Sequence, residues 1–363
     1  MANNIVTINV SQTIGATPSL LQRTGLIVTQ GGTNTATGTV SLITQLPDFT
    51  AIKAASGTPL TTLTADLTTF FGQGSANSVY VLELGTGTTA AGVTALTTFL
   101  TNNPSKYYAI KVPDGWDAEA TFPTLAAAYA STSAKTYFFV RVTNSTYTTF
   151  ATATPYKSIV MLLPDTTTPA TESAIMAMFW KVLNYNPSNT NQVTPMAFSY
   201  MVGVTPLNVT QALQATYKAA YVNFVATGAE GGISNTILKW GTTADGRDFT
   251  YWYSVDWVQI NVQIALANEI INGSNNPIAP LFYNQAGINR LQLRAQSTVN
   301  SGIAFGMVLA PATVAAVDFQ TYTLHNPNDY KVGLYQGLSL TYTPARGFTA
   351  ITFNINVTDF VQQ

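Results

Sequence analysis

Both ends of the chain alternate strictly between apolar and polar residues. Alternation with a period of two indicates a β-strand that buries one face and exposes the other to water. The apolar positions are Val6, Ile8 and Val10 near the N-terminus, and Ile351, Phe353, Ile355 and Val357 near the C-terminus. Such strands either form edges of the chain's own sheet or act as arms that enter a neighbour's sheet. We favour arms, because terminal segments fray unless something holds them.

Between residues 25 and 230, apolar strand-like runs alternate with helical patterns. Strand runs separated by helical segments of about 10–15 residues are typical of βα units and a largely parallel sheet. Strands are predicted at 24–30, 78–84, 106–112, 135–142, 157–163 and 195–204. Helices are predicted at 59–71, 90–103, 117–131, 146–152, 171–185 and 208–225.

The pattern changes after the glycine-rich turn at 228–232. A short strand is predicted at 237–241, followed by the longest apolar helix at 250–272. This helix is apolar on two faces, so it is expected to lie between other elements rather than on a surface. The remaining predicted elements of this α+β unit are a helix at 283–300, strands at 303–309 and 337–344, and a polar loop between those strands.

These patterns divide the chain into four parts. They are an N-terminal arm and the start of a core domain (1–24), one or more outer α/β domains (25–232), an α+β core domain (233–345) and a C-terminal β-strand arm (346–363).

The chain carries very little charge. Of its 363 residues, 15 are Lys or Arg and 16 are Asp or Glu, so the net charge is −1 and charged residues make up 9%. Ordinary soluble proteins contain roughly 25%, so this surface must consist of Thr, Asn, Gln, Ser and Ala. A net charge near zero promotes association. Without a basic excess to neutralise phosphates, nucleic-acid binding is not expected. A soluble enzyme of low charge remains an alternative.

Several kinds of site and segment are not expected. The chain has no cysteine, so disulfides, thiolate zinc sites and a cysteine nucleophile are excluded. No run of about 18 apolar residues is present to span a membrane. The first ten residues lack the charged and apolar regions of a signal peptide, so synthesis and assembly in the cytoplasm are expected.

Two motifs could belong to an enzyme, one as part of a catalytic triad and the other as a nucleotide-binding loop. The only histidine, His325, lies in the turn-rich sequence LHNPNDY without a G-x-S-x-G elbow, which favours a solvated loop residue over a member of a catalytic triad. Gly85, Gly87 and Gly92 lie between a predicted strand and a predicted helix, but their spacing is not the G-x-G-x-x-G of dinucleotide-binding loops. No acidic residue ends the next strand to bind a ribose. An ordinary βα turn is favoured, and a nucleotide-binding enzyme using this turn stays an alternative.

An acidic cluster follows one of the predicted strands. Asp114, Asp117 and Glu119 could bind a hard cation such as Ca²⁺. Acidic residues at the start of a helix more often cap the helix and complement its dipole. We therefore expect no metal site here.

Two arginines are separated by four residues on one predicted helix. Arg290 and Arg294 would repel each other slightly, and in a chain so poor in charge they indicate an acidic partner. That partner is either internal, Asp256 or Glu269, or belongs to another protein. Because no acid, base and nucleophile come together in the sequence, we expect no catalytic residue and no cofactor.

The chain after residue 235 resembles the C-terminal core domain of tail sheath proteins from contractile phage tails and phage-tail-like particles. The similarity rests on four features in a fixed order. They are the Trp-bearing helix within 245–271, the helix of Arg290 and Arg294, the loop at 325–331 and the closing GFTAITFNINV. The similarity covers about 235–363 and 1–25. The middle α/β region matches only in kind, because sheath proteins carry variable inserted outer domains at this place.

The resemblance implies a core domain built from both ends of the chain, with extended arms and an inserted outer α/β domain. It further implies a non-enzymatic subunit that polymerises as stacked hexameric rings around a tail tube and lends its arms to neighbouring sheets. Its partners would be other copies of itself, the tail tube protein, and baseplate and tail terminator proteins. Contraction in the virion tail would drive the tube through the host envelope. The alternatives are the nucleotide-binding enzyme and another virion or surface-layer structural protein.

Overall fold

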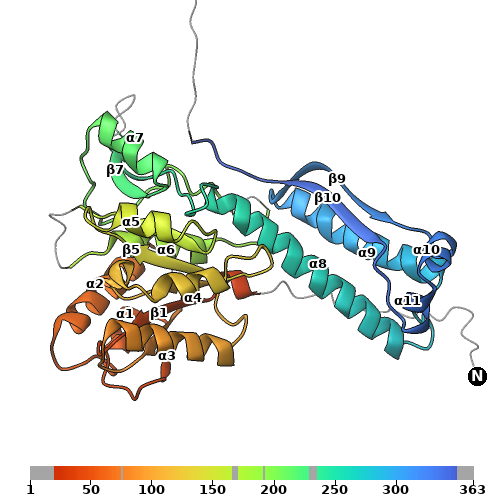
Figure 1. The fold of residues 1–363 in the computed structure, drawn as a ribbon, viewed down its shortest axis with the longest axis horizontal. Coiled ribbons are helices and arrows are strands. Elements are labelled where there is room, and N and C mark those ends of the chain that lie inside the picture. The colour runs from red at the N-terminus through yellow and green to blue at the C-terminus, as the bar shows by residue number, and fades with distance from the viewer. Residues whose placement is uncertain (1–19, 75–76, 166–170, 191–192, 229–234, 350–363) are drawn as a thin grey trace, which may run out of the picture.

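The computed structural model describes residues 20–349 except for 75–76, 166–170, 191–192 and 229–234. Within these residues the chain forms an α/β lobe and a narrower C-terminal module, and the long helix α8 (Phe249–Asn275) runs from one to the other (Figure 1). The strands expected at 6–10 and 351–357 lie outside the described residues.

The lobe is built on a six-stranded sheet with the order β2-β3-β1-β4-β5-β6. Edge strand β2 runs antiparallel to β3, and all other neighbours are parallel. Consecutive residues such as Phe138, Phe139 and Val140 are all buried, as expected for a parallel sheet covered on both faces. The strands are β1 (Gly25–Thr29), β2 (Val40–Ile43), β3 (Val79–Glu83), β4 (Ala109–Lys111), β5 (Tyr137–Arg141) and β6 (Ile159–Leu162).

Helices cover both faces of this sheet and produce a three-layered lobe (Figure 1). One apolar cluster joins the sheet to α2 (Thr58–Gly72), α6 (Ala174–Asn184) and the start of α8. The other joins it to α3 (Thr89–Asn102), α4 (Phe122–Ala128) and α5 (Tyr147–Ala153). The shorter elements of the lobe are η1 (Leu20–Arg23), α1 (Leu46–Phe49), η2 (Trp116–Ala118), α7 (Gln211–Ala219), β7 (Phe224–Gly228) and β8 (Asn235–Lys239).

The mixed α/β class with a mostly parallel sheet is confirmed. The strand predicted at 195–204 is wrong: this segment is irregular, and only Tyr200 forms an isolated bridge, to Ile237. Phe198 and Gly203 have φ values of 61° and 63°, and an extended strand cannot contain such residues.

The helix predicted at 208–225 is too long. Helix α7 ends at Ala219, Tyr221 has a φ of 55°, and the chain then enters β7, which pairs antiparallel with β8. The domain boundary expected between residues 232 and 233 falls in the connection between these two strands, so the domain limits remain a proposal.

Three further predictions need correction. The helix predicted at 117–131 is divided into η2 and α4, with a proline in the first turn of α4. The strand predicted at 303–309 begins only at Val308, because α9 (Gln285–Ala304) extends into the predicted range and Gly306 then turns the chain with a φ of 78°. The polar loop contains two short helices, α10 (Phe319–His325) and α11 (Pro327–Lys331).

Helix α8 belongs to two cores at once. Its first half is buried in the lobe, where Trp252, Tyr253 and Trp257 join the apolar cluster, whereas beyond Ile260 only Ala265 and Gly273 are fully buried. The expectation of a sandwiched helix is therefore confirmed for its first half. None of the described helices is long and apolar enough to cross a membrane.

The C-terminal module packs α9 against α8 and covers them with a two-stranded antiparallel ribbon, β9 (Val308–Ala316) and β10 (Leu338–Pro344) (Figure 1). Helices α10 and α11 connect the two strands at the far end. Val299, Met307 and Val314 belong to the same apolar cluster as Trp257 and the lobe. One continuous core therefore connects the module to the lobe.

Gly302 of α9 lies where this helix, Trp257 and β9 meet. A Cβ atom at this position would lie 2.8 Å from Cζ3 of Trp257 and 3.1 Å from Cγ2 of Val308. Trp257 is buried, and its indole N–H donates a 2.7 Å hydrogen bond to the carbonyl of Pro187, so it has little freedom to move. We expect Gly302→Ala to lower the free energy of unfolding by about 1–3 kcal/mol, as measured by urea denaturation.

The matched control is Gly72→Ala at the end of α2, where no atom lies within 4 Å of the added methyl group. Alanine favours helix by up to about 1 kcal/mol over glycine, so this substitution is expected to be neutral or stabilising. An equal loss of stability in the two variants would show that crowding at Trp257 is not the cause.

Candidate assembly surface

The carboxyl ends of β1 and β4 are where a ligand would be expected in this sheet. After β1 the chain continues to β2 and β3 on one side, and after β4 it continues to β5 on the other. Open α/β sheets bind their ligands at such switch points. The side chains at this place therefore test the enzyme alternative.

Lys111 at the end of β4 fills the switch point. Its side chain is 1% exposed, and its ammonium lies 2.7 Å from Asp66 and 3.1 Å from Asp114. Asp114 is also 2.7 Å from the guanidinium of Arg141. Desolvation alone would raise the pKa of Asp114, but Lys111 and Arg141 lower it below its ordinary value. At Asp66, desolvation has a larger effect than the attraction of Lys111, so the pKa of Asp66 is raised.

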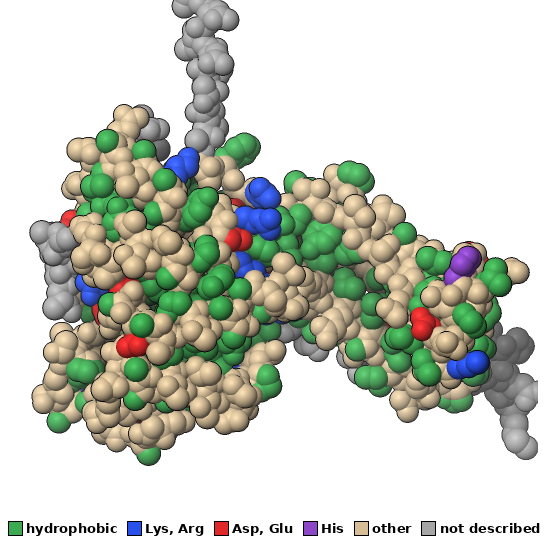
Figure 2. Space-filling view, viewed as in Figure 1, with side chains coloured by type: hydrophobic (Ala, Val, Ile, Leu, Met, Phe, Trp, Pro, Cys, Tyr) green, Lys and Arg blue, Asp and Glu red, His purple; other side chains and the backbone are tan. Residues whose placement is uncertain are grey.

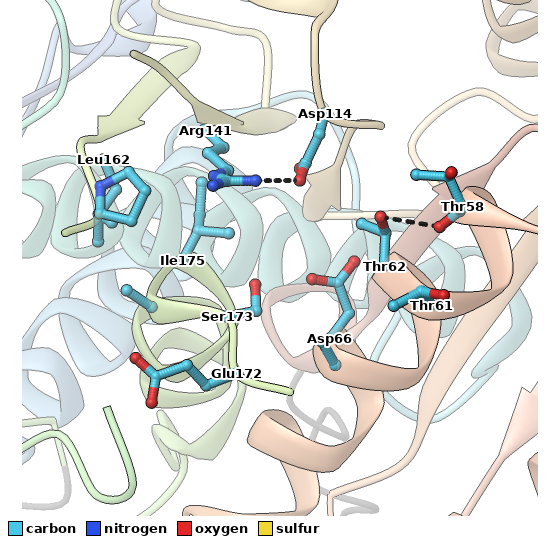
Figure 3. Close-up of a pocket in the computed structure, with 13 residues that line it drawn as sticks. Thr58, Thr61, Thr62, Asp66, Asp114, Arg141, Leu162, Glu172, Ser173 and Ile175 are labelled. Atoms are coloured by element: carbon cyan, nitrogen blue, oxygen red, sulfur yellow. Dashed lines mark hydrogen bonds and ion pairs between the residues drawn. The ribbon is translucent and has the colours of Figure 1, made fainter. Parts of the chain in front are cut away.

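Figure 3 shows the cleft of about 290 Å³ beside this network, with Arg141 directed at Asp114 and Asp66 on the opposite wall. Glu172, also on the wall, accepts a 2.8 Å hydrogen bond from the backbone N–H of Thr205. The charged groups of the cleft are thus paired within the chain. Three carboxylates would also repel a phosphate, so the cleft is better described as a structural ion-pair network.

The turn at Gly85–Gly92 is occupied by a carboxylate. Glu83 at the end of β3 accepts hydrogen bonds from the backbone N–H groups of Gly31, Gly85 and Thr33, at 2.7, 2.7 and 2.9 Å. Backbone N–H groups of this kind would have to bind the phosphates of a nucleotide. A buried glutamate satisfies them instead, which disfavours nucleotide binding at this turn.

The acidic residues 114, 117 and 119 do not converge. Asp114 belongs to the Lys111 network, the carboxylate of Asp117 accepts a hydrogen bond from the hydroxyl of Thr146, and Glu119 accepts one from the backbone of Thr121. Within the described residues, no group of three or more His, Cys, Asp or Glu side chains is placed to hold a metal ion.

Arg290 and Arg294 both face Glu269 of α8. Nε of Arg290 forms an ion pair and hydrogen bond with Oε1 of Glu269, and Nε of Arg294 lies 3.9 Å from Oε2. Of the two internal partners considered, the structure selects Glu269. Each guanidinium is about one-third exposed, and their role in a contact with another protein remains a prediction.

Asp256, the other internal candidate, fixes the start of α8 to the sheet. Its Oδ2 atom accepts hydrogen bonds from the hydroxyls of Tyr108 at 3.0 Å and Tyr137 at 2.7 Å. The ammonium of Lys157 lies 3.9 Å from Oδ1 and 4.8 Å from the ring centre of Trp252. Burial raises the pKa of Asp256 to about 6, although Lys157 and the two hydroxyls oppose this shift.

The C-terminal module concentrates exposed apolar side chains. Of the nineteen large apolar side chains that are exposed among the described residues, twelve fall within 270–348, which is less than a quarter of the chain. Such side chains indicate an interaction surface when they gather in one region. Of the twelve side chains within 270–348, those more than 60% exposed are Ile278, Phe282, Leu293, Leu324, Val332 and Phe348.

The ribbon of β9 and β10 adds an uncharged face to this module. Leu338, Leu340 and Tyr342 turn inward and are only half-buried, and the residues between them are exposed. In Figure 2 the middle of the module shows apolar and neutral side chains, whereas charged side chains gather on the lobe, at the start of α8 and near α10 and α11. A two-stranded ribbon is marginally stable by itself, and here it is stabilised by packing against α8 and α9.

The seven arm positions cannot be placed on this surface. Val6, Ile8, Val10, Ile351, Phe353, Ile355 and Val357 lie outside the described residues, and their role stays a prediction. The described chain ends beside the lobe, where Thr349 lines a recess with Lys218 and Tyr221.

Comparisons with known proteins identify the fold. No family model and no curated protein matches the chain. A chain in the six-fold symmetrised baseplate of the anti-feeding prophage has a TM-score of 0.67 at 15% identity, with 99% of both chains covered. A chain in the contracted helical sheath of the same particle has a TM-score of 0.66 at 14% identity, with 98% of both covered.

A third solved structure is a sheath tail protein from Listeria innocua. It has a TM-score of 0.56 at 10% identity and covers 81% of this chain and 88% of its own. The chain has the fold of a tail sheath protein. The resemblance predicted from the C-terminal part of the sequence is thus confirmed for the fold, and the sheath fold includes the α/β lobe, for which the sequence showed a match only in kind.

Several residues that shape these sites were not predicted from the sequence. Glu83 and Lys111 are charged residues inside apolar strands of a chain with few charges, which is a usable signal for buried ion pairs. The partners of Asp256 carry no comparable signal, because Tyr108 and Tyr137 are common strand residues.

The raised pKa of Asp256 makes stability depend on pH. Its ordinary value is 3.8 and its folded value is about 6, so folding favours the neutral acid. This contribution is fully present below about pH 4 and is lost as pH rises through 6. It corresponds to roughly 3 kcal/mol. We expect Asp256→Asn to flatten the decline of the unfolding free energy between pH 4 and 6, as measured by urea denaturation across that range.

Asp318→Asn is the control, because the pKa of Asp318 is shifted in the opposite direction to that of Asp256. The hydroxyl and backbone N–H of Thr321 lower the pKa of Asp318, so its contribution is present above its ordinary pKa and is lost as pH falls. This substitution should leave the decline between pH 4 and 6 in place. If the unfolding free energies of Asp256→Asn and the unchanged protein change in parallel with pH, Asp256 does not titrate as described.

Proposed function

We propose that this chain is the structural subunit of a contractile tail sheath. The observation that carries the proposal is the likeness of fold over 98–99% of the chain to chains of a particle with a helical sheath. The surface supports the proposal, because charge is scarce and exposed apolar side chains gather in the C-terminal module. The ribbon of that module consists of two strands among the described residues. Glu83 accepts the backbone N–H groups at the Gly85–Gly92 turn, and the charges at the switch point are paired, which disfavours the nucleotide-binding alternative.

In this proposal the subunits form stacked hexameric rings around a tail tube. Residues 1–24 and 233–345 contribute to the core domain, 25–232 form the outer α/β part, and 346–363 are the C-terminal arm. The partners are other copies of the chain, the tube protein, and baseplate and terminator proteins. The particle is assembled in the host cytoplasm as the tail of a virion or a related particle, and its contraction drives the tube through the host envelope.

The terminal arms supply the connection between subunits. Burying Ile351, Phe353, Ile355 and Val357 in a neighbour would contribute roughly 1.5–3 kcal/mol for each side chain, and each ladder hydrogen bond about 0.5–1.5 kcal/mol. Ordering an arm of roughly ten residues costs about 1–2 kcal/mol for each. These contributions nearly cancel for one arm. Several contacts must therefore form together, which favours cooperative assembly on a template.

Electron microscopy of the purified chain tests this function. We expect wide hollow tubes from the full chain, because the subunits carry their own connections. A variant that lacks 349–363 is expected to stay folded and soluble but to form no tubes, because the apolar face it loses belongs to a neighbour's sheet. Circular dichroism and size-exclusion chromatography check that this shortened chain is folded.

Three outcomes would contradict the proposal. Flat lattices from the full chain would indicate a surface-layer type of protein, and thermal stabilisation by nucleotides would favour the enzyme. Collapse of the shortened chain into an unfolded aggregate would show that the terminal strand completes its own core.

A further inference from the structure

Three positively charged side chains line one recess, where the lobe meets the start of α8. They are Lys218 of α7, Arg247 just before α8, and Arg346 after β10, and the recess has a volume of about 240 Å³. Figure 2 shows Lys and Arg side chains gathered at the start of α8. The chain has 15 Lys and Arg residues in all, so three of them in one small recess form an unusual concentration of positive charge.

The two arginines of this recess differ from the other arginines of the chain. Among the described residues, neither guanidinium group has an oxygen acceptor in a hydrogen bond or an ion pair. The other four arginines each have such a partner: Arg23 has Asn77, Arg141 has Asp114, and Arg290 and Arg294 share Glu269. The N–H donors of Arg247 and Arg346 are therefore available to a ligand.

Aromatic rings hold both guanidinium groups in place. The guanidinium carbon of Arg346 lies 4.5 Å from the ring centre of Tyr251. The guanidinium carbon of Arg247 lies 5.1 Å from the ring centres of Tyr251 and Trp252. A guanidinium that stacks on a ring keeps the N–H groups along its edge available for hydrogen bonds, and it loses little conformational freedom when a ligand binds.

Strained backbone surrounds the recess. Tyr221 and Trp240, which form its aromatic walls, have φ values of 55° and 68° and are two of the four described non-glycine residues with positive φ. Bulky residues rarely adopt this conformation, and such strain gathers at functional sites. At Gly246, with a φ of 83°, a Cβ atom would lie 2.6 Å from the ring of Tyr221. The ring and the loop before α8 therefore pack closely and form the recess before any ligand binds.

The acidic groups beside the recess are already engaged. Asp248 caps α8 and accepts hydrogen bonds from the backbone N–H groups of Thr250 at 3.2 Å and Gly347 at 3.0 Å. Asp245 accepts a hydrogen bond from the indole N–H of Trp252 at 3.0 Å. In the described part of the chain, neither carboxylate forms an ion pair with the two arginines.

A second copy of the chain has no free carboxylate to offer among the described residues. Every described carboxylate that is not buried has a partner within its own chain. These pairs include Asp48 with Thr44, Glu119 with Thr121, Asp318 with Thr321 and Asp329 with Tyr322. The positive charge of the recess therefore favours an acidic group from a different protein.

We infer that this recess binds a glutamate-bearing segment of a different protein, with Arg247 and Arg346 contacting its carboxylates. Guanidinium groups bind carboxylates and phosphates through paired N–H donors, and Lys218 adds a third positive charge. The rings of Tyr221 and Trp240 offer apolar contact to the methylene groups of a glutamate side chain, which a free phosphate lacks. The inference goes beyond the proposed function and does not rest on it.

Binding of a short acidic peptide tests this inference. The probe is a peptide of alternating glutamate and alanine that carries a neutral fluorescent dye, and its counterpart with glutamine in place of glutamate is the uncharged control. Fluorescence anisotropy with the full chain gives the Kd, and low ionic strength is used because salt screens exposed charges. We expect saturable binding of the glutamate peptide and no measurable binding of the glutamine peptide.

Two double variants locate the site. Arg247→Gln/Arg346→Gln is expected to weaken binding of the glutamate peptide by about tenfold or more, because both sets of paired donors are lost. Lys53→Gln/Lys331→Gln removes the same charge from two exposed lysines outside the recess, and we expect it to change the Kd by less than about twofold. Circular dichroism checks that both variants are folded.

A second measurement needs no variant. A carbodiimide joins a carboxylate to a nearby lysine amine as an amide, with loss of water to the reagent. In the unchanged chain, the glutamate peptide is expected to be joined to Lys218, as located by mass spectrometry of the digested product.

Several outcomes would overturn the inference. Equal weakening by the two double variants would show diffuse attraction of charge rather than a site. Cross-links at other lysines without one at Lys218 would contradict the location. Inorganic phosphate that displaces the glutamate peptide at concentrations below the Kd of the peptide would make phosphate the ligand. Absence of binding, or equal binding of the glutamine peptide, would leave the recess without the proposed partner. None of these results depends on whether the full chain forms tubes.

Discussion

The structure depends on one long helix, α8, that is shared by the lobe and the C-terminal module. The first half of α8 is a core element of the α/β lobe, and its second half carries α9 and the ribbon. Trp257 lies at the transition, hydrogen-bonded to the lobe through Pro187 and packed against Gly302 of the module. Because a single apolar cluster runs through this point, force applied to the module is transmitted to the lobe.

Six charged residues are buried among the described residues of a chain that has few charges. Buried charges are expensive to desolvate and are tolerated when they are paired or hydrogen-bonded. Here they close the carboxyl end of the sheet and hold the start of α8, which leaves an outer surface even poorer in charge than the composition suggests. The buried charged residues are Asp66, Glu83, Lys111, Asp117, Lys157 and Asp256.

Periodicity predicts the parts of this fold that bury a continuous apolar run. The strands around Ile27, Val81 and Phe139 and the two-faced helix α8 follow from such runs. It fails where backbone geometry decides, as at Phe198 with its positive φ, and where short edge elements such as β2 bury little. The candidate assembly surface is harder to predict from the sequence than the fold. The terminal alternation predicts strands whose positions lie outside the described residues, and the hydrogen bonds that close the edge of β9 depend on α9 lying beside it, which no local pattern contains.

The free edge of β9 is closed by the side-chain amides of Gln292 and Gln296, which hydrogen-bond the backbone of Val314 and Ala312. Two open edges would let ribbons of any two subunits pair in either direction, and a surface with almost no charge offers little repulsion to prevent it. Gln292 and Gln296 remove one of these edges by hydrogen bonding alone, at no cost in charge. Hydrogen bonding by neutral side chains thus protects one edge of the ribbon in a protein that has few charges with which to protect it.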